Sequence, residues 1–169
     1  FASVRKSFEG RTNYDYDLVD ITRQATAERG RLVYKVMQAA LAAGEKPLFA
    51  QAGERFMQLL MQQDSLLATR PEFRLDTWVN RAEAIGSTPE EKAHYRFNAK
   101  VQITTWGNRL AAEDGGLRDY AHKEWSGLLS QLYAKRWRTY IDQKLRYWDA
   151  PSAPSIDWFA LDEQWLRLN

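Results

Sequence analysis

Residues 15–43 read DYDLVDITRQATAERGRLVYKVMQAALAA, and this stretch has the length and apolar spacing of one long helix. Its apolar residues are spaced by three residues, four residues or sums of the two, so we expect them on one buried face of the helix. They are Leu18, Ile21, Ala25, Leu32, Val36, and Ala39 or Ala40. Asn13 or Asp15 can cap the start of this helix, and Gly44 can end it in a left-handed conformation. The stretch therefore predicts a helical fold.

Helix-start and helix-stop residues divide the remaining chain into further helices. The strongest start signal is Thr88-Pro89-Glu90-Glu91, a capping box with proline at the first helical position. We expect helices at 47–67, 73–85, 88–106, 117–148 and 156–168, with a loop at 108–116. No stretch alternates like a strand, so the predicted fold class is all-α, an antiparallel bundle of five to six helices. Residues 13–169 then form a single helical domain, and residues 1–12 form a lead-in or linker.

Composition excludes several classes of chemistry. The chain has 169 residues, no cysteine and two histidines, His94 and His122, which are 28 positions apart. Disulfides, thiol nucleophiles and cysteine-based or histidine-rich metal sites are therefore excluded, and we expect no cofactor. The 24 Lys and Arg residues against 22 Asp and Glu residues are too balanced for a protein that coats nucleic acid. No apolar run reaches the roughly 20 residues that a membrane span needs.

Paired carboxylates can cleave a glycosidic bond, but each candidate pair has a simpler explanation. The candidates are the cluster Asp15, Asp17 and Asp20, and the pairs Glu90-Glu91, Glu113-Asp114 and Asp162-Glu163. The first two sets fall in first helical turns, where negative charge complements the helix dipole, and the other two are typical of solvated surface. Asp119, His122 and Ser126 have the residue types of a hydrolytic triad on one helix face. A serine within a helix lacks free amides for an oxyanion hole, so a surface or interface histidine is favoured.

Trp106 and Tyr120 stand out among the aromatic residues by their position. Trp106 ends an expected helix just before a glycine and a polar loop, and Tyr120 lies in the first turn of the next helix. Two rings beside one loop can stack on the apolar face of a sugar, although core packing accounts for most aromatic residues. The basic and aromatic segment 131–148 also fits single-stranded nucleic acid, but a bundle helix with an aromatic core face and a basic outer face explains it better.

Several strings of the chain resemble one protein family closely. They are YDLVDITRQ (16–24), LATRPEF (67–73), QITTWG (102–107), LRDYAHKEWSGLL (117–129) and YAKRW (133–137). In this order the strings are similar to the α-N-acetylglucosaminidases of glycoside hydrolase family 89. The resemblance extends over about residues 14–148, and several ordered strings are more specific than one short motif.

The resemblance implies the C-terminal, all-helical domain of a retaining glycosidase. Such an enzyme removes terminal α-linked N-acetylglucosamine, in animals from heparan sulfate. Its two catalytic glutamates lie on a preceding (β/α)₈ barrel, outside this chain, so the chain alone is expected to be inactive. The implied partners are that barrel and a glycan ending in N-acetylglucosamine. The family's pattern also implies that Trp106, Leu117 and Tyr120 line the sugar pocket and contribute shape and stacking.

Two departures from the family's pattern bear on these residues. The loop between Trp106 and Tyr120 is longer than in the animal enzymes, which affects the register of Leu117, and His122 stands where relatives commonly have asparagine. Because relatives act in lysosomes or outside the bacterial cytoplasm, we expect export to one of these compartments. The alternative hypothesis is a stand-alone helical module that binds carbohydrate or protein without a barrel.

Overall fold

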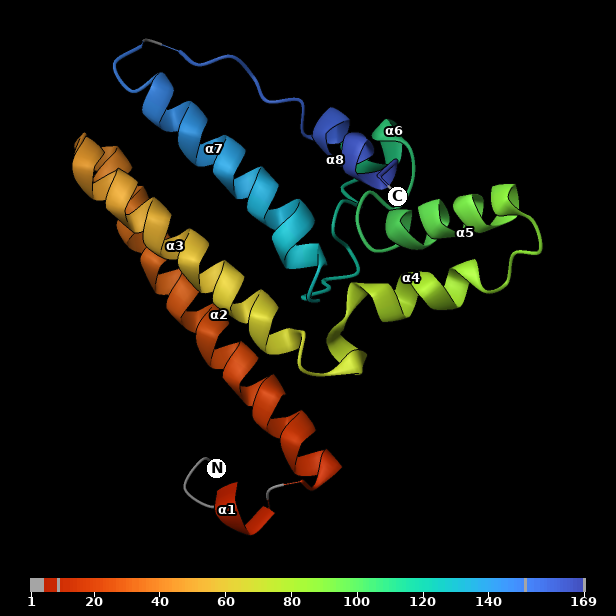
Figure 1. The fold of residues 1–169 in the computed structure, drawn as a ribbon. Coiled ribbons are helices and arrows are strands. Elements are labelled where there is room, and N and C mark those ends of the chain that lie inside the picture. Colours follow the sequence, from red (N-terminus) through yellow and green to blue (C-terminus); the bar gives the residue numbers. More distant parts are fainter. Residues whose placement is uncertain (1–4, 9, 151, 169) are drawn as a thin grey trace.

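The computed structural model of the chain describes residues 5–8, 10–150 and 152–168, and this part is all-α, as predicted. Its longer helices are α2 (Thr12–Ala43), α3 (Lys46–Leu67), α4 (Leu75–Glu83), α5 (Pro89–Val101), α7 (Ala134–Arg146) and α8 (Trp158–Leu166) (Figure 1). Single turns form α1 (Arg5–Phe8) and α6 (Arg109–Ala112). Within the described residues, no helix is long and apolar enough to cross a membrane.

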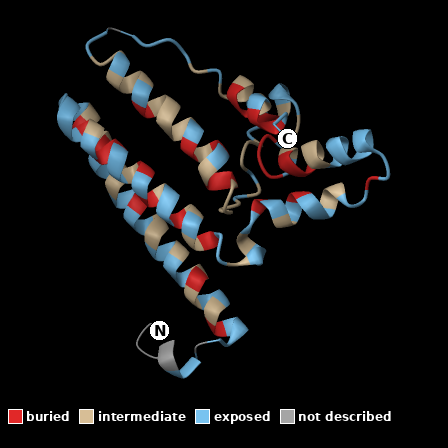
Figure 2. Ribbon diagram, viewed as in Figure 1, coloured by how far each residue is buried: buried red, intermediate tan, exposed pale blue. Residues whose placement is uncertain are grey.

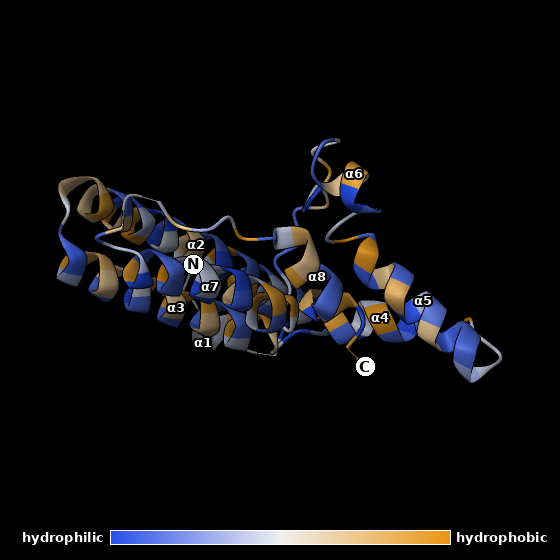
Figure 3. Ribbon diagram, turned by 90° about the horizontal axis from the view of Figure 1, so that it is seen from above, coloured by the Kyte–Doolittle hydropathy of each residue, from blue (hydrophilic) through white to orange (hydrophobic). Residues whose placement is uncertain are grey.

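Three helices, α2, α3 and α7, lie side by side in an up-down-up bundle (Figures 1 and 3). Gly44, with a φ of 72°, ends α2 in the left-handed conformation, and Pro47 occupies the first turn of α3, both as predicted. The tight turn between them makes α2 and α3 antiparallel. Their shared core with α7 consists of Met37, Ala40, Phe49, Ala52, Met57, Ala134 and Ile141.

The helices α4, α5 and α8 form a second group beside one end of the bundle (Figure 1). Leu75 and Val79 of α4 and Leu161, Trp165 and Leu166 of α8 form a core with Ile103, Leu128 and Leu132, which lie between α5 and α7 in the chain. The predicted capping box opens α5: the Glu91 amide donates to the Thr88 hydroxyl, and the Glu91 carboxylate accepts from the Thr88 amide. The buried residues of α5, Ala99 and Lys100, lie at its C-terminal end (Figure 2). That end of α5 therefore leads directly from the core into the next segment.

The largest departure from the predicted helices is residues 102–128, called the connecting segment below. The helix expected over 88–106 ends at Val101. The helix expected over 117–148 begins only with a π-helical turn at Leu129–Tyr133, which continues into α7. The predicted boundaries were therefore wrong on both sides of the connecting segment, whereas those of α3, α4 and α8 agree within about two residues.

Left-handed backbone explains why the helix prediction failed in the connecting segment. Trp106, Asp119 and His122 have φ angles of 63°, 58° and 47°, which no right-handed helix contains. Such residues cost about 1 kcal/mol or more each and persist where surrounding contacts hold them. The expected loop at 108–116 instead contains α6, because the Asn108 side chain accepts the Ala111 amide hydrogen at 3.0 Å and caps the turn.

The start and the buried face of α2 also differ from the prediction. α2 begins at Thr12, inside the expected lead-in, and Asn13 and Asp15 lie within the helix instead of capping it. Its buried residues are Tyr14, Val19, Gly30, Met37 and Ala40, whereas Ile21, Leu32 and Val36 are exposed. Ala40 of the expected face is buried, but because apolar residues lie on more than one side of α2, spacing alone indicated the wrong face at Ile21, Leu32 and Val36. Figure 3 shows hydrophobic and hydrophilic residues mixed along the helices of the bundle.

Candidate functional site

Trp106 and Tyr120 lie together on the surface of the connecting segment. The two residues are 46% and 63% exposed, and their ring centroids are 5.9 Å apart in an edge-on arrangement. Large rings normally stabilise a fold by burial, so two exposed rings in contact are available to a ligand. The predicted proximity of the two rings is confirmed, and their role in sugar binding stays a prediction.

Two backbone hydrogen bonds set the relative positions of these rings. The Trp106 amide donates to the Val101 carbonyl at 2.8 Å, which closes the C-terminal end of α5. The amide of Asp119, the residue before Tyr120, donates to the Thr104 carbonyl at 2.6 Å. Thr104 is itself buried, so this second bond ties the Tyr120 turn to a fixed point two residues before Trp106.

Leu117, the third predicted site residue, belongs to the turn that carries Tyr120. Its carbonyl accepts the Tyr120 amide hydrogen at 3.1 Å, and its own amide donates to the Ala111 carbonyl at 3.2 Å. The Leu117 residue is half-buried, unlike the two rings. The structure therefore brings all three predicted residues into the connecting segment and makes Leu117 part of the support for Tyr120.

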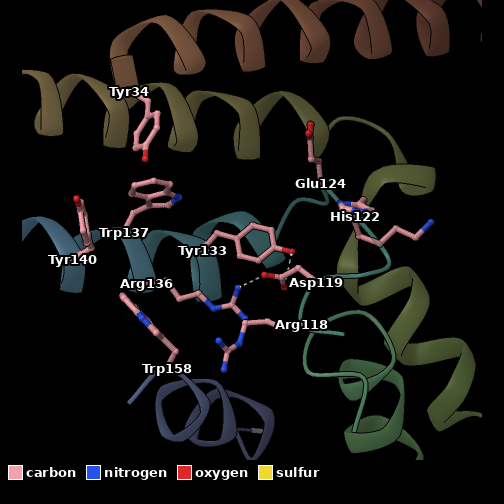
Figure 4. A pocket seen from close by; sticks show the side chains of 11 residues that line it. Tyr34, Arg118, Asp119, His122, Glu124, Tyr133, Arg136, Trp137, Tyr140 and Trp158 are labelled. Atoms are coloured by element: carbon pink, nitrogen blue, oxygen red, sulfur yellow. Dashed lines mark hydrogen bonds and ion pairs between the residues drawn. The ribbon is translucent and has the colours of Figure 1, made fainter. Parts of the chain in front are cut away.

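A cavity of about 600 Å³ lies beside this turn, between α2, α7, the start of α8 and the connecting segment (Figure 4). Aromatic side chains make up much of its lining: Tyr34, Tyr133, Trp137, Tyr140 and Trp158. His122 also lines the cavity, and its ring centroid is 6.5 Å from that of Tyr120. Neither Trp106 nor Tyr120 lines this cavity, but His122 lies between Tyr120 and a cavity of the size that accepts a small ligand.

Charged side chains of alternating sign form one wall of the cavity, with Asp162 directly behind the residues that line it. Asp162 of α8 is fully buried, and its carboxylate accepts hydrogen bonds from Arg136 Nε at 2.7 Å and Arg118 Nε at 3.1 Å. Arg136 Nη1 also donates to Asp119 Oδ2 at 2.5 Å (Figure 4). The Tyr133 hydroxyl donates to Asp119 Oδ1 at 3.2 Å. Buried charges are retained only when paired in this way, so the four ions form one unit.

Protonation in this wall is governed by burial and by the paired charges. Burial raises the pKa of Asp162, and the two arginines oppose that shift. For Arg136 burial lowers the pKa, but hydrogen bonds and charges from Asp162 and Asp119 outweigh it, and the pKa is raised. Burial and the Asp119 charge also raise the pKa of Tyr133 well above its usual value. Tyr133 therefore stays a neutral hydrogen-bond donor to Asp119.

The arrangement of Asp119, His122 and Ser126 considered from sequence is not formed. Asp119, His122 and Ser126 do not share a helix face, because the connecting segment is not helical there. Ser126 donates its hydroxyl hydrogen to Asp64 at 3.3 Å, and Asp119 is held by Arg136. Over the described ranges, no three His, Cys, Asp or Glu side chains are grouped so as to hold a metal ion.

Sequence reasoning missed Arg136 and Asp162 as members of the site. Asp162 was expected on solvated surface and is 0% exposed, and Arg136 was expected on an outer basic face but points inward to Asp162. A signal for Asp162 was present in its spacing. It precedes Trp165 and Leu166 by three and four residues, so it shares the buried face of α8 with them.

Comparison with protein families gives a match over the whole chain. Residues 1–169 match the family described as the alpha-N-acetylglucosaminidase (NAGLU) C-terminal domain. Human alpha-N-acetylglucosaminidase is 33% identical over 130 residues, which cover 76% of this chain and 17% of the human protein.

Solved structures show the same similarity in three dimensions. The family 89 glycoside hydrolase from Clostridium perfringens, in complex with PUGNAc, has a TM-score of 0.94 and 33% identity over 99% of this chain. A variant of that enzyme with two Glu-to-Gln substitutions, in complex with its substrate GlcNAc-α-1,4-galactose, has a TM-score of 0.94 and 34% identity over 100% of this chain. The chain spans 19% of the length of each of these structures.

Proposed function

This chain belongs to the α-N-acetylglucosaminidase C-terminal domain family, and from that premise we propose that it is the helical domain of a glycosidase for terminal α-linked N-acetylglucosamine. The names of the human and bacterial relatives and the bound substrate of the bacterial enzyme support this activity for the parent polypeptide. The substrate class is a glycan whose non-reducing end is α-linked N-acetylglucosamine, with heparan sulfate as the animal example.

Within that enzyme, the chain's role is to form part of the wall of the sugar pocket. The observation that carries this role is the pair of exposed, touching rings of Trp106 and Tyr120 in the connecting segment. Aromatic rings pack against the C–H face of a pyranose, and the Tyr120 hydroxyl adds a hydrogen-bond donor and acceptor. These contacts position the sugar and do not break its glycosidic bond.

The bond-breaking carboxylates belong to the catalytic barrel, outside this chain. The two carboxylates paired with Arg136 support this assignment, because Asp162 is fully buried and Asp119 is held in the same ion-pair cluster. A carboxylate with no exposed surface cannot reach a glycosidic bond, and Asp119 alone does not make the carboxylate pair that the reaction needs. We therefore expect the purified 169-residue chain to be inactive, and measurable turnover by it would contradict the assignment.

Kinetics of the parent polypeptide test the role of the rings. Trp106→Ala and Tyr120→Ala should each lower kcat/KM by about 10-fold for an α-N-acetylglucosaminide, since each removes a stacking contact of about 1 kcal/mol and loosens substrate placement. Tyr95→Ala, at an exposed aromatic residue of α5, serves as the matched control and should change kcat/KM by less than about 2-fold. Wild-type kinetics for both ring variants would remove the rings from the sugar site.

We further propose that the parent polypeptide is exported, to the periplasm or medium of a bacterium or to the lysosome of an animal cell. The support is the family's association with extracellular and lysosomal glycans. An antibody against this chain, applied to cell fractions of the source, should detect a band several times larger than 19.7 kDa outside the cytoplasmic fraction. A cytoplasmic band near 19.7 kDa would instead favour the stand-alone module.

A further inference from the structure

We propose that Asp119 is the positioning residue that holds the Trp106–Tyr120 pair in its sugar-binding geometry. This inference rests on the proposed function, because it gives a role to a residue that need not touch the substrate. The residue immediately precedes Tyr120 and has a left-handed φ of 58°, a conformation that non-glycine residues adopt only when other contacts hold them.

The backbone of Asp119 connects the two halves of the ring pair. Its amide donates to the Thr104 carbonyl at 2.6 Å, and its carbonyl accepts the His122 amide hydrogen at 2.8 Å. The first bond fixes the Tyr120 turn against the buried residues that lead into Trp106. The second bond closes the turn on the other side of Tyr120. The backbone amide and carbonyl of Asp119 therefore both form hydrogen bonds that fix the position of Tyr120.

The side chain of Asp119 attaches the turn that carries Tyr120 to the neighbouring helices. Its two carboxylate oxygens accept hydrogen bonds from Arg136 and from Tyr133. Arg136 is in turn held by the fully buried Asp162 of α8, which also accepts a hydrogen bond from Arg118. Arg136 of α7 thus holds Asp119, and Asp162 of α8 holds Arg118, the two residues that precede Tyr120. Removal of one partner from such a cluster leaves the remaining buried charges unpaired.

The substitution Asp119→Asn tests the ion pair while leaving the backbone conformation accessible, because asparagine tolerates the left-handed region as well as aspartate. Glu54→Gln is the matched control, since it also converts a carboxylate that pairs with an arginine of α7, namely Arg138, but this pair is solvent-exposed and joins α7 to α3 instead of to the connecting segment. Hydrogen exchange of the parent polypeptide provides a readout that does not depend on activity. Asp119→Asn should speed amide exchange in a peptide spanning residues 117–122 by about 10-fold, and Glu54→Gln should leave that peptide unchanged.

Kinetics then decide whether Asp119 acts through the rings. Asp119→Asn should raise KM by about 10-fold with a smaller change in kcat, and the same substitution made in a Tyr120→Ala background should change KM by less than about 2-fold. A purely structural residue would instead add its effect in both backgrounds. Unchanged exchange at residues 117–122, or an equal rise in KM in both backgrounds, would overturn the inference.

The proposed function can fail separately from this inference. If Tyr120→Ala and Trp106→Ala leave the kinetics unchanged, the sugar-binding role of the rings is wrong. The exchange measurement still decides in that case whether Asp119 fixes the geometry of the pair, because it needs no substrate.

Discussion

Asp64 of α3 should be one of the most sensitive surface-accessible residues for stability, because it caps the start of the final bundle helix from another helix. Its Oδ1 atom accepts backbone amide hydrogens from Gly127 at 2.7 Å and Ser130 at 3.0 Å, and its Oδ2 atom accepts the Ser126 hydroxyl at 3.3 Å. These amides lie where the connecting segment turns into the π-helical turn and α7, and no intrahelical carbonyl serves them.

The expected loss follows from these contacts. Each hydrogen bond between a backbone amide and a carboxylate contributes about 1.5 kcal/mol at the lower end of its range, which suits the half-buried Asp64. The two amide bonds together then contribute about 3 kcal/mol, and the long hydroxyl bond adds little. Asp64→Ala should therefore lower the free energy of unfolding by about 3 kcal/mol, and Asp64→Asn by about half of that, since its carbonyl oxygen still accepts.

Urea unfolding followed by far-UV circular dichroism measures this loss, with the midpoint shifted at an unchanged slope. Asp17→Ala is a suitable control because Asp17 is exposed on α2, and its effect should stay within about 0.5 kcal/mol. A loss below about 0.5 kcal/mol for Asp64→Ala would refute the reasoning, because it would mean that water replaces the cap at no cost.

Three further stability predictions follow, two from the surroundings of glycines and one from a pKa shift. Gly30→Ala should stabilise the chain by about 1 kcal/mol, because alanine has the higher helix propensity and the added methyl would lie in ordinary van der Waals contact, 3.8 Å from the Phe56 ring. Gly53→Ala should instead destabilise it by about 1 kcal/mol, because the methyl would lie 3.1 Å from the buried Ile141 side chain; a stabilised Gly53→Ala variant in urea titrations would contradict this. The hydrogen bond from Arg96 lowers the pKa of Glu83 below its ordinary 4.5. The ionised Glu83 carboxylate therefore stabilises the fold at pH values above 4.5. This stabilisation is lost as the pH falls through the lowered pKa of Glu83. The wild-type chain should therefore melt above a Glu83→Gln variant at about pH 6, with the gap closing towards about pH 3, and a gap that does not change with pH would contradict the assignment.

Much of the helical framework was predictable from short-range signals. The capping box at Thr88, the glycine at Gly44 and the proline at Pro47 act within one helical turn, and each ended or began a helix where expected. The ring pair was also predictable, because Trp106 and Tyr120 flank one loop in the sequence. Such features need no knowledge of the rest of the chain.

The connecting segment was not predictable in the same way. Residues 117–128 have helical spacing and helix-forming side chains, yet the left-handed Asp119 and His122 interrupt the helix. The contacts that stabilise those conformations come from Thr104 and Arg136, which lie 15 and 17 residues from Asp119 along the chain. No local propensity contains that information.

Local chemistry along the chain was sufficient for the all-α class, for most helix ends and for the family, because each depends on residues close together in sequence. The buried face of α2, the cap that Asp64 supplies to α7 and the charged wall behind Tyr120 were decided only in three dimensions. Each of these joins residues from different helices. Their free energy arises from desolvation and from pairing, and both exist only once the helices have packed.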